Sequence, residues 1–275
     1  MTNQNLLQTL KYNLIALDID GTLINDQHEI TEEMQSTIAA LLGAGADVVL
    51  CTGRGPTSTI PILNKLSLTG SAIVHNGSVV IEAGTKQVLY ENGFSIVELF
   101  PFITYCRQHD INFDVNTALQ MMIETTTPEL TQMYIDYEES PVLCSDLDRL
   151  EQQVVKMTVF AEESIISEVE AIWATWDLPE QLQLIRSGEQ FLDIQSKTAS
   201  KGNALEAYAK LKQIDRSQVI AIGNYFNDVS MLQFAGLGVA MGNSPDEVKE
   251  LADYVTDTNN NDGAAKALRK YVWNE

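Results

Sequence analysis

Three short apolar runs in the first part of the chain constrain its fold most strongly. The runs Leu14–Leu17, Asp47–Cys51 and Ala72–His75 are each followed by polar residues or glycine. Between the first two, Thr31–Leu42 places its apolar residues on one helical face and ends at Gly43. Short continuous apolar strands that alternate with helices predict a parallel sheet, buried on both faces and joined by right-handed crossovers.

The C-terminal part of the chain repeats this alternation. The expected elements are a helix over Ala204–Leu211, a strand over Val219–Ile222, a helix over Asp228–Phe234, a strand over Gly238–Met241, and a last helix through Leu268 that Asp262 or a neighbouring Asn caps. Both ends of the chain therefore predict parts of the same α/β core.

The middle of the chain has a different pattern. Val154–Phe160, Gln183–Arg186 and Phe191–Gln195 resemble strands, and the last two flank a Ser-Gly-Glu turn typical of a hairpin. Between them, Ile165–Trp176 has helical apolar spacing. Hairpins mixed with helices predict an α+β unit inserted into the parallel core.

The sequence thus predicts an α/β protein with a Rossmann-like parallel-sheet core and an inserted α+β cap domain. The pattern changes near Gly84 and again near Asp193. We therefore assign residues 1–84 and 193–275 to the core and residues 85–192 to the insert.

Composition excludes some partners. The 275 residues, 45% of them hydrophobic, suffice for one large domain or two modest ones. Because 38 Asp and Glu residues outweigh 17 Lys and Arg residues, the formal net charge is −21. Such a surface repels nucleic acids and anionic membranes. The three cysteines form no CxxC pair and the N-terminal residues show no signal peptide, so a cytoplasmic location is expected. Oligomeric state is not predicted.

Two carboxylates follow the first apolar run. Asp18 and Asp20 are two residues apart in an extended segment, so their side chains can face one pocket. Two carboxylates at that distance repel each other unless a cation lies between them or one is protonated. Mg²⁺ prefers oxygen ligands, and one carboxylate can attack a phosphorus centre while the other moves protons. The alternative interpretation is that one aspartate only starts a turn.

Further polar residues follow other predicted strands. Ligands of open parallel sheets bind at the carboxyl ends of the strands. Thr52 and Gly53 can offer a hydroxyl and backbone N–H groups to a phosphate, and Lys201, before a helix, can neutralise phosphate oxygens. Gly223-Asn224 and Asn227-Asp228 face the same edge. Each motif alone is also compatible with an ordinary turn, a helix cap or a surface lysine.

Taken in order, these motifs resemble a known family. The set DIDGT, TGR, SKGNAL and GNYFNDVSML resembles the haloacid dehalogenase superfamily, specifically the Cof-like subfamily IIB phosphatases. HNGSVV and GVAMGNSPDEVKELADYVTDTNNNDG are similar to the same family. The resemblance implies a Mg²⁺-dependent phosphatase that acts on small phosphorylated metabolites, sugar phosphates foremost, with a cap that chooses the leaving group.

The resemblance also implies roles for single residues. Asp18 is the nucleophile that forms an aspartyl-phosphate, and Asp20 is the general acid and then the base. The implied phosphate-binding residues are Ile19 through its backbone, Thr52, Gly53, Lys201 and Asn227. The implied metal site comprises Asp18, the Asp20 carbonyl group, Asn224 and Asp228, of which Asp228 orders the water shell of the metal.

One position departs from the family pattern. The family usually has Gly-Asp where this chain has Gly223-Asn224, and that aspartate binds the metal. Asn224 offers a carbonyl oxygen without negative charge, so weaker Mg²⁺ binding is a hypothesis, and Asp228 is a candidate to compensate.

Other functions are compatible with the same residues. A phosphomutase would return the phosphoryl group from aspartate to a sugar instead of to water. A phospho-acceptor module also gathers aspartates, a threonine and a lysine at strand ends, although such modules are usually shorter. A catalytically weakened binding protein, with Asn224 as the cause, is a further alternative.

Overall fold

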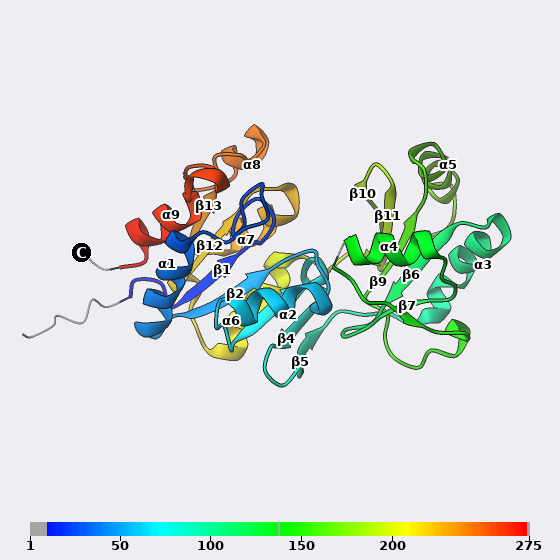
Figure 1. Ribbon diagram of the computed structural model, residues 1–275, viewed down its shortest axis with the longest axis horizontal. Helices are drawn as coiled ribbons and strands as arrows, with labels where there is room; N and C mark the ends of the chain where they lie inside the picture. Colours follow the sequence, from blue (N-terminus) through cyan, green and yellow to red (C-terminus); the bar gives the residue numbers. More distant parts are fainter. Residues whose placement is uncertain (1–9, 137, 274–275) are drawn as a thin grey trace, which may run out of the picture.

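The computed structural model describes residues 10–136 and 138–273. Figure 1 shows two parts side by side: a core built from both ends of the sequence, blue to cyan and yellow to red, and a green cap from the middle. The chain thus enters the cap from the core and returns to it.

The core sheet has the strand order β14-β13-β12-β1-β2-β3-β4-β5. Its strands from β14 to β3 are parallel, while β4 and β5 add an antiparallel edge. The strand bounds are β1 Leu14–Leu17, β2 Asp47–Cys51, β3 Ser71–Val74, β4 Val79–Glu82, β5 Val88–Glu91, β12 Val219–Gly223, β13 Leu237–Ala240 and β14 Tyr254–Val255.

Helices cover both faces of this sheet. Alternate residues of β1 point to opposite faces, with Ile15 in one apolar cluster and Leu14 in another. The first cluster includes helices α1, α2 and α9, and the second includes α6, α7 and α8. The helix bounds are α1 Glu32–Gly43, α2 Pro56–Lys65, α6 Lys201–Lys212, α7 Val229–Phe234, α8 Asp246–Glu250 and α9 Gly263–Tyr271.

The cap has its own sheet, with the strand order β10-β11-β9-β6-β7-β8. Its neighbouring strands are antiparallel except for β7 and β8. One face packs on helices α3 and α5 around Phe102 and Trp173. The bounds are β6 Asn112–Asn116, β7 Met121–Ile123, β8 Val142–Leu143, β9 Lys156–Phe160, β10 Leu182–Gly188, β11 Phe191–Ser196, α3 Phe100–His109, α4 Pro128–Asp136 and α5 Glu163–Trp173.

The α/β class with a parallel-sheet core and an α+β insert is confirmed, but the strands shift the segment boundaries. β5 pairs with β4 and so extends the core beyond residue 84. β11 pairs with β9 and β10, so the cap sheet extends beyond residue 192 to Ser196. Both boundaries were predicted where the pattern of strand and helix signals changes, whereas strand pairing decides which sheet an edge segment joins.

Several predicted elements agree closely with the structure, while others differ at their end residues. The ranges of β1 and β2 are those predicted, and Thr31 caps α1 by accepting a hydrogen bond from the Met34 N–H group. His75 is outside β3 in a left-handed turn, and Asp228 ends a 3₁₀ turn before α7. Asp262 occupies the N-cap position of α9 without a side-chain cap hydrogen bond, and its carboxylate accepts a hydrogen bond from Thr31.

Gly77 allows the core to bring α6 close to β3. Its φ is +93°, and a Cβ atom there would lie 2.0 Å from the Ser200 carbonyl oxygen and 2.7 Å from the Lys201 nitrogen. Only glycine combines this conformation with so close a backbone contact. Gly77 therefore fixes where the first turn of α6, and with it Lys201, meets the carboxyl end of β3.

We expect Gly77→Ala to lower the free energy of unfolding by about 2–4 kcal/mol, through backbone strain and steric overlap. The matched control is Gly43→Ala at the end of α1, where a Cβ meets no atom within 4 Å. Urea denaturation of both variants measures the difference. Equal stability of the two variants would contradict this role of Gly77.

Over the ranges that the structure describes, no helix is long and apolar enough to cross a membrane.

Candidate active site

The carboxyl ends of three neighbouring strands bring the predicted motifs together. β1 pairs in parallel with β12 on one side and with β2 on the other. Asp18, Asn224 and Thr52 follow these three strands, so they lie at one edge of the core sheet. Strand order also reverses at β1, and open α/β sheets bind ligands at such a switch point.

A buried lysine joins two aspartates at this edge. Lys201 Nζ donates to Asp18 Oδ1 at 2.7 Å and to Asp228 Oδ1 at 2.6 Å, and its side chain is 1% exposed. Burial, followed by the charge of Asp228, raises the pKa of Asp18 to about 7, although Lys201 opposes the shift. Burial by itself lowers the pKa of Lys201, but the two carboxylates outweigh it and raise that pKa. The charged lysine therefore holds the two carboxylates together.

Asp228 also orders the loop after β12. Its Oδ2 accepts hydrogen bonds from the backbone N–H groups of Asn224 at 2.8 Å and Tyr225 at 2.9 Å. Both carboxylate oxygens of this fully buried residue therefore have protein partners. The resemblance implies that Asp228 orders the water shell of a metal; in this structure its contacts position Lys201 and the Asn224 loop.

Oxygen atoms from both motifs converge beside Asp18. The Asn224 amide lies 3.0 Å from Asp18 Oδ2, 2.9 Å from the Asp20 carbonyl oxygen and 3.2 Å from Thr22 Oγ1. Gly21 makes this approach possible, because a Cβ there would lie 2.5 Å from the amide nitrogen of Asn224. With its nitrogen toward Asp18, the Asn224 amide donates hydrogen bonds to these three oxygens. In the opposite orientation, Asn224 Oδ1 lies beside the oxygens of Asp18 and Asp20.

This oxygen set fits a hard divalent cation such as Mg²⁺. Within the described residues, no group of three His, Cys, Asp or Glu side chains gathers for a metal. A cation here would instead take one carboxylate, one carbonyl and one amide oxygen and keep several waters, as Mg²⁺ commonly does. The residues present therefore suit Mg²⁺ better than a metal that needs nitrogen or sulfur ligands.

Asp20 has a partner that sequence reasoning missed. Its half-exposed carboxylate accepts two hydrogen bonds from Arg54, at 2.9 Å from Nε and 2.7 Å from Nη2. Arg54 also pairs with Glu138 of the cap at 3.1 Å. In this conformation the Asp20 side chain faces Arg54, so a role in proton transfer would require it to turn away from Arg54.

The remaining predicted phosphate-binding residues lie along the same edge. Thr52 is buried, and its Oγ1 accepts a hydrogen bond from the Arg54 N–H group at 3.0 Å. Asn227 Nδ2 donates to Asn76 Oδ1 at 2.9 Å. Gly53 is so close to this amide that a Cβ would be 2.9 Å from Asn76 Oδ1. Ile19 is fully buried, and its carbonyl oxygen accepts hydrogen bonds from backbone N–H groups of the following turn.

Sequence reasoning assigned no role to three residues that the structure places at this edge, namely Thr22, Arg54 and Asn76. Each lies inside a stretch already singled out: DIDGT, TGR and HNG. The signal that could have identified these three residues is that each is a polar residue within a motif already singled out. Which of these side chains meets which partner depends on the packing of separate loops.

A family model described as haloacid dehalogenase-like hydrolase matches residues 15–268. The chain therefore belongs to this hydrolase family, which confirms the superfamily predicted from the four motifs.

Three similar proteins support this assignment. Phosphatase YwpJ from Bacillus subtilis (strain 168) is 28% identical over 93% of this chain and 98% of its own. A haloacid dehalogenase-like hydrolase from Bacteroides thetaiotaomicron is 30% identical, with a TM-score of 0.85 over 94% of this chain and 99% of that chain. The subclass IIB sugar phosphatase BT4131 is 23% identical and shares the fold, with a TM-score of 0.77 over 94% and 98% of the two chains. The fold is thus that of the predicted Cof-like IIB group.

Proposed function

We propose that this protein is a Mg²⁺-dependent phosphatase that hydrolyses monoesters of small metabolites, sugar phosphates foremost, through a phosphorylated Asp18. The observation that carries the proposal is the buried Asp18–Lys201–Asp228 network at the strand ends. It leaves Asp18 Oδ2 free of the lysine and 3.0 Å from the Asn224 amide, which also lies 2.9 Å from the Asp20 carbonyl oxygen. The Asp18 carboxylate is thereby held next to the positive charge of Lys201 and next to oxygen atoms that can bind a cation.

In the first half-reaction, an oxygen of Asp18 attacks phosphorus and the bond from phosphorus to the ester oxygen breaks. The leaving oxygen takes a proton from Asp20 after its side chain has left Arg54. Thr52, the backbone at Ile19 and Gly53, and Asn227 hold the phosphoryl oxygens. The ammonium group of Lys201 stabilises the negative charge on them.

In the second half-reaction, Asp20 accepts a proton from water, and the resulting oxygen nucleophile attacks phosphorus. The bond from phosphorus to Asp18 breaks, which releases inorganic phosphate and restores the carboxylate. Lys201 stays bonded to Asp228 throughout, so that the positive charge remains in place while Asp18 changes charge.

Asp18, the Asp20 carbonyl group and Asn224 would hold the Mg²⁺ ion, with Asp228 acting on it through the Asn224 loop. When bound, the cation neutralises negative charge on the phosphoryl oxygens and on Asp18. The residues of the chain then supply the nucleophile and the proton, and they orient the phosphoryl group.

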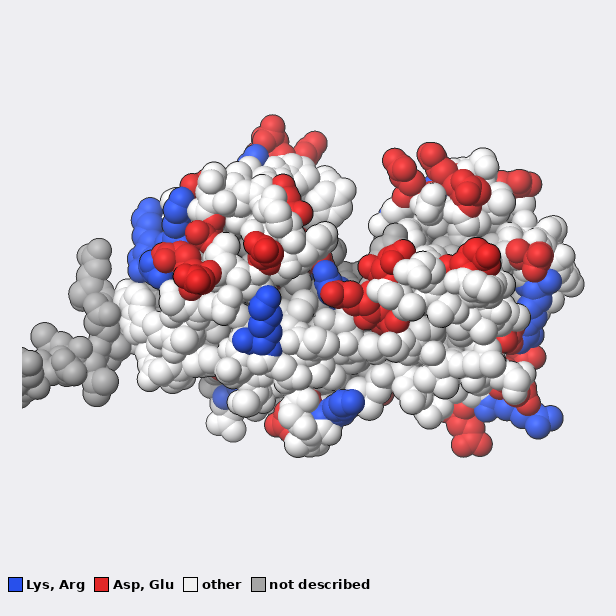
Figure 2. All heavy atoms as spheres, in the orientation of Figure 1, with Lys and Arg blue, Asp and Glu red and all other residues white. Residues whose placement is uncertain are grey.

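The cap supports this function by meeting the core beside the site. Ser58 of α2 donates a hydrogen bond to Glu139 of the cap at 2.8 Å, and Arg54 pairs with Glu138. Figure 2 shows that the molecule is hollowed between the core and the cap on this face. Opening of these contacts would admit substrate, and their closure would exclude water during transfer.

Phosphate release from a panel of phosphorylated metabolites, with and without Mg²⁺, tests the proposal. We expect release that requires Mg²⁺ and stops when a chelator is added. Release without a bisphosphate activator would separate hydrolysis from a mutase reaction. Folded protein that releases no phosphate at any Mg²⁺ concentration would contradict the proposal.

We expect Asn224→Asp to bind Mg²⁺ about tenfold more tightly, because it adds a negative charge to the oxygen set. Isothermal titration calorimetry gives both dissociation constants. The matched control is Asn64→Asp, which adds the same charge at an exposed position of α2. An unchanged Mg²⁺ affinity in Asn224→Asp would show that this amide does not limit metal binding.

A further inference from the structure

The cap contains a cavity of about 740 Å³ that lies apart from the proposed active site. Its walls come from α3, α4 and α5 and from the ends of β6, β9 and β11. Figure 1 shows α3 and α5 on the side of the cap away from the core. Among the described residues, none that we place in the proposed active site lines this cavity. Sites for small molecules commonly have a volume of this order, so the cap holds a second candidate site.

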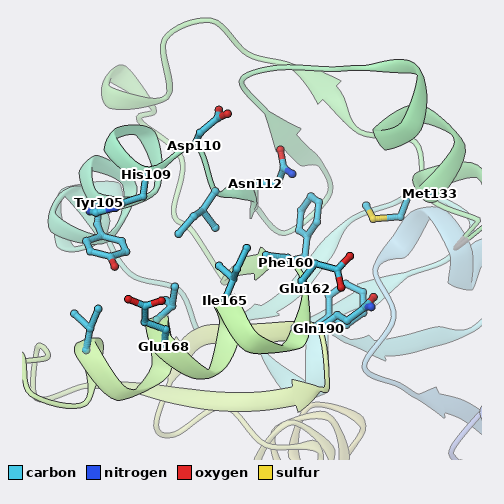
Figure 3. A pocket seen from close by; sticks show the side chains of 15 residues that line it. Tyr105, His109, Asp110, Asn112, Met133, Phe160, Glu162, Ile165, Glu168 and Gln190 are labelled. Carbon is cyan, nitrogen blue, oxygen red and sulfur yellow. The ribbon is translucent and has the colours of Figure 1, made fainter.

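Aromatic rings form two parts of the cavity wall. The ring of Tyr105 stacks on His109 with centroids 4.2 Å apart, and Phe160 and Phe191 form a second pair with centroids 6.4 Å apart. Figure 3 shows Tyr105 at one end of the cavity, Met133 at the other and Phe160 between them. Aliphatic side chains extend the apolar lining, namely those of Ile111, Ile165, Val169 and Ile172. Such a wall favours a ligand with an apolar, preferably aromatic, body.

Acidic side chains dominate the charge of the cavity lining. Asp110, Glu162 and Glu168 line it, and among the described residues no lysine or arginine does. None of these three carboxylates has an ion-pair partner within 4.0 Å in the described part of the chain. Arg107 of α3 and Arg186 of β10, from neighbouring elements, pair with other carboxylates. The cavity therefore attracts a cationic ligand and repels an anionic one.

The charge of Glu168 acts at the aromatic wall. Burial, followed by this charge, raises the pKa of Tyr105. In Figure 3 the Glu168 carboxylate lies beside the Tyr105 side chain, although the two residues belong to different helices, α5 and α3. An ammonium group placed there would meet a carboxylate and the face of an aromatic ring together, and both interactions are favourable.

We propose that this cavity is a second ligand site, which binds a small organic cation that carries an ammonium group on an aromatic or aliphatic body. A metal cation would leave the apolar wall unused, and an organic anion would face three carboxylates. The proposal does not rest on the phosphatase function, because the residues of the cavity are not those of the proposed active site.

Three indole derivatives test the charge requirement, because they share a ring and a two-carbon arm and differ only in the end group. Tryptamine ends in an ammonium group, tryptophol in a hydroxyl group and indole-3-propionate in a carboxylate. Isothermal titration calorimetry with the full chain measures each dissociation constant. We expect tryptamine to bind about fivefold more tightly than tryptophol, and indole-3-propionate to bind most weakly.

Ethylamine has the ammonium group without the ring, so it measures the general attraction of cations to a protein with a net charge of −21. We expect it to bind about tenfold more weakly than tryptamine, because it cannot bury an aromatic ring. Binding of ethylamine as tight as that of tryptamine would show that surface charge alone attracts the cation, and would overturn the proposal.

Glu168→Gln removes one carboxylate from the lining at nearly constant volume. We expect the affinity for tryptamine to fall about three- to fivefold and the affinity for tryptophol to stay unchanged, which would show that the cavity is intact. Glu163→Gln, exposed on the same helix but outside the lining, is the matched control and should keep both affinities. Asp20→Asn should also keep them, because Asp20 belongs to the proposed active site and not to the cap.

Each of three further results would overturn the proposal. The first is the absence of saturable tryptamine binding, and the second is equal affinity for tryptamine and indole-3-propionate. The third is a tryptamine affinity that Asp20→Asn lowers and Glu168→Gln leaves unchanged, which would place the cation in the proposed active site. Phosphate release enters none of these measurements, so failure of the proposed phosphatase function would not affect them.

Discussion

Asp18→Asn is expected to reduce kcat for phosphate release by about 10⁴-fold or more, the scale seen when a covalent nucleophile is removed. Asp18 is buried at the end of β1, with Oδ1 on Lys201 and Oδ2 beside Asn224. Asparagine has the same shape and keeps an oxygen for Lys201, so the fold should survive. An amide cannot, however, form the phosphorylated intermediate.

Two measurements separate this role from a structural one. After an acid quench, mass spectrometry of the wild-type peptide that contains Asp18 should detect the added phosphoryl group, and the Asp18→Asn peptide should not carry it. Thermal unfolding should show that the variant is folded, and exposed Asp177→Asn serves as the matched control. Substantial turnover by folded Asp18→Asn would place the nucleophile elsewhere.

Lys201→Met is expected to lower the free energy of unfolding by about 3–5 kcal/mol at neutral pH, measured in a chelator. The substitution keeps the length of the side chain but leaves Asp18 and Asp228 buried without their shared cation. The cost arises from two desolvated carboxylates that repel each other, rather than from a lost surface contact. Phosphate release should fall as well, because no other ammonium group contacts Asp18 within the described residues.

A second substitution tests the electrostatic cause. In Lys201→Met combined with Asp228→Asn, one uncompensated charge is gone, so more than half of the lost stability should return. Lys210→Met, in the same helix but 73% exposed on its side chain, should change stability by less than about 0.5 kcal/mol. Equal losses in the single and double variants would show that packing rather than charge explains the effect.

Much of the core could be predicted because the information is local. A short apolar strand such as Leu14–Leu17 is recognisable without its neighbours, and the polar residues after it mark the carboxyl end. The parallel pairing of β1 and β2 then places Asp18 and Thr52 at the same edge of the sheet, independently of the loop conformations. Segment boundaries were less predictable, since β5 and β11 join their sheets through pairing with distant strands.

The sequence by itself determined the family, the parallel core and the set of residues gathered at its edge, because strand periodicity and ordered motifs are properties of short segments. Only the tertiary structure decided the partners: Lys201 with Asp18 and Asp228, and Asp20 with Arg54. It also paired β9 of the cap with β6 and β11, which lie far apart in sequence. Such contacts depend on how separate elements pack. Burial then determines how strongly the charged groups in these contacts interact.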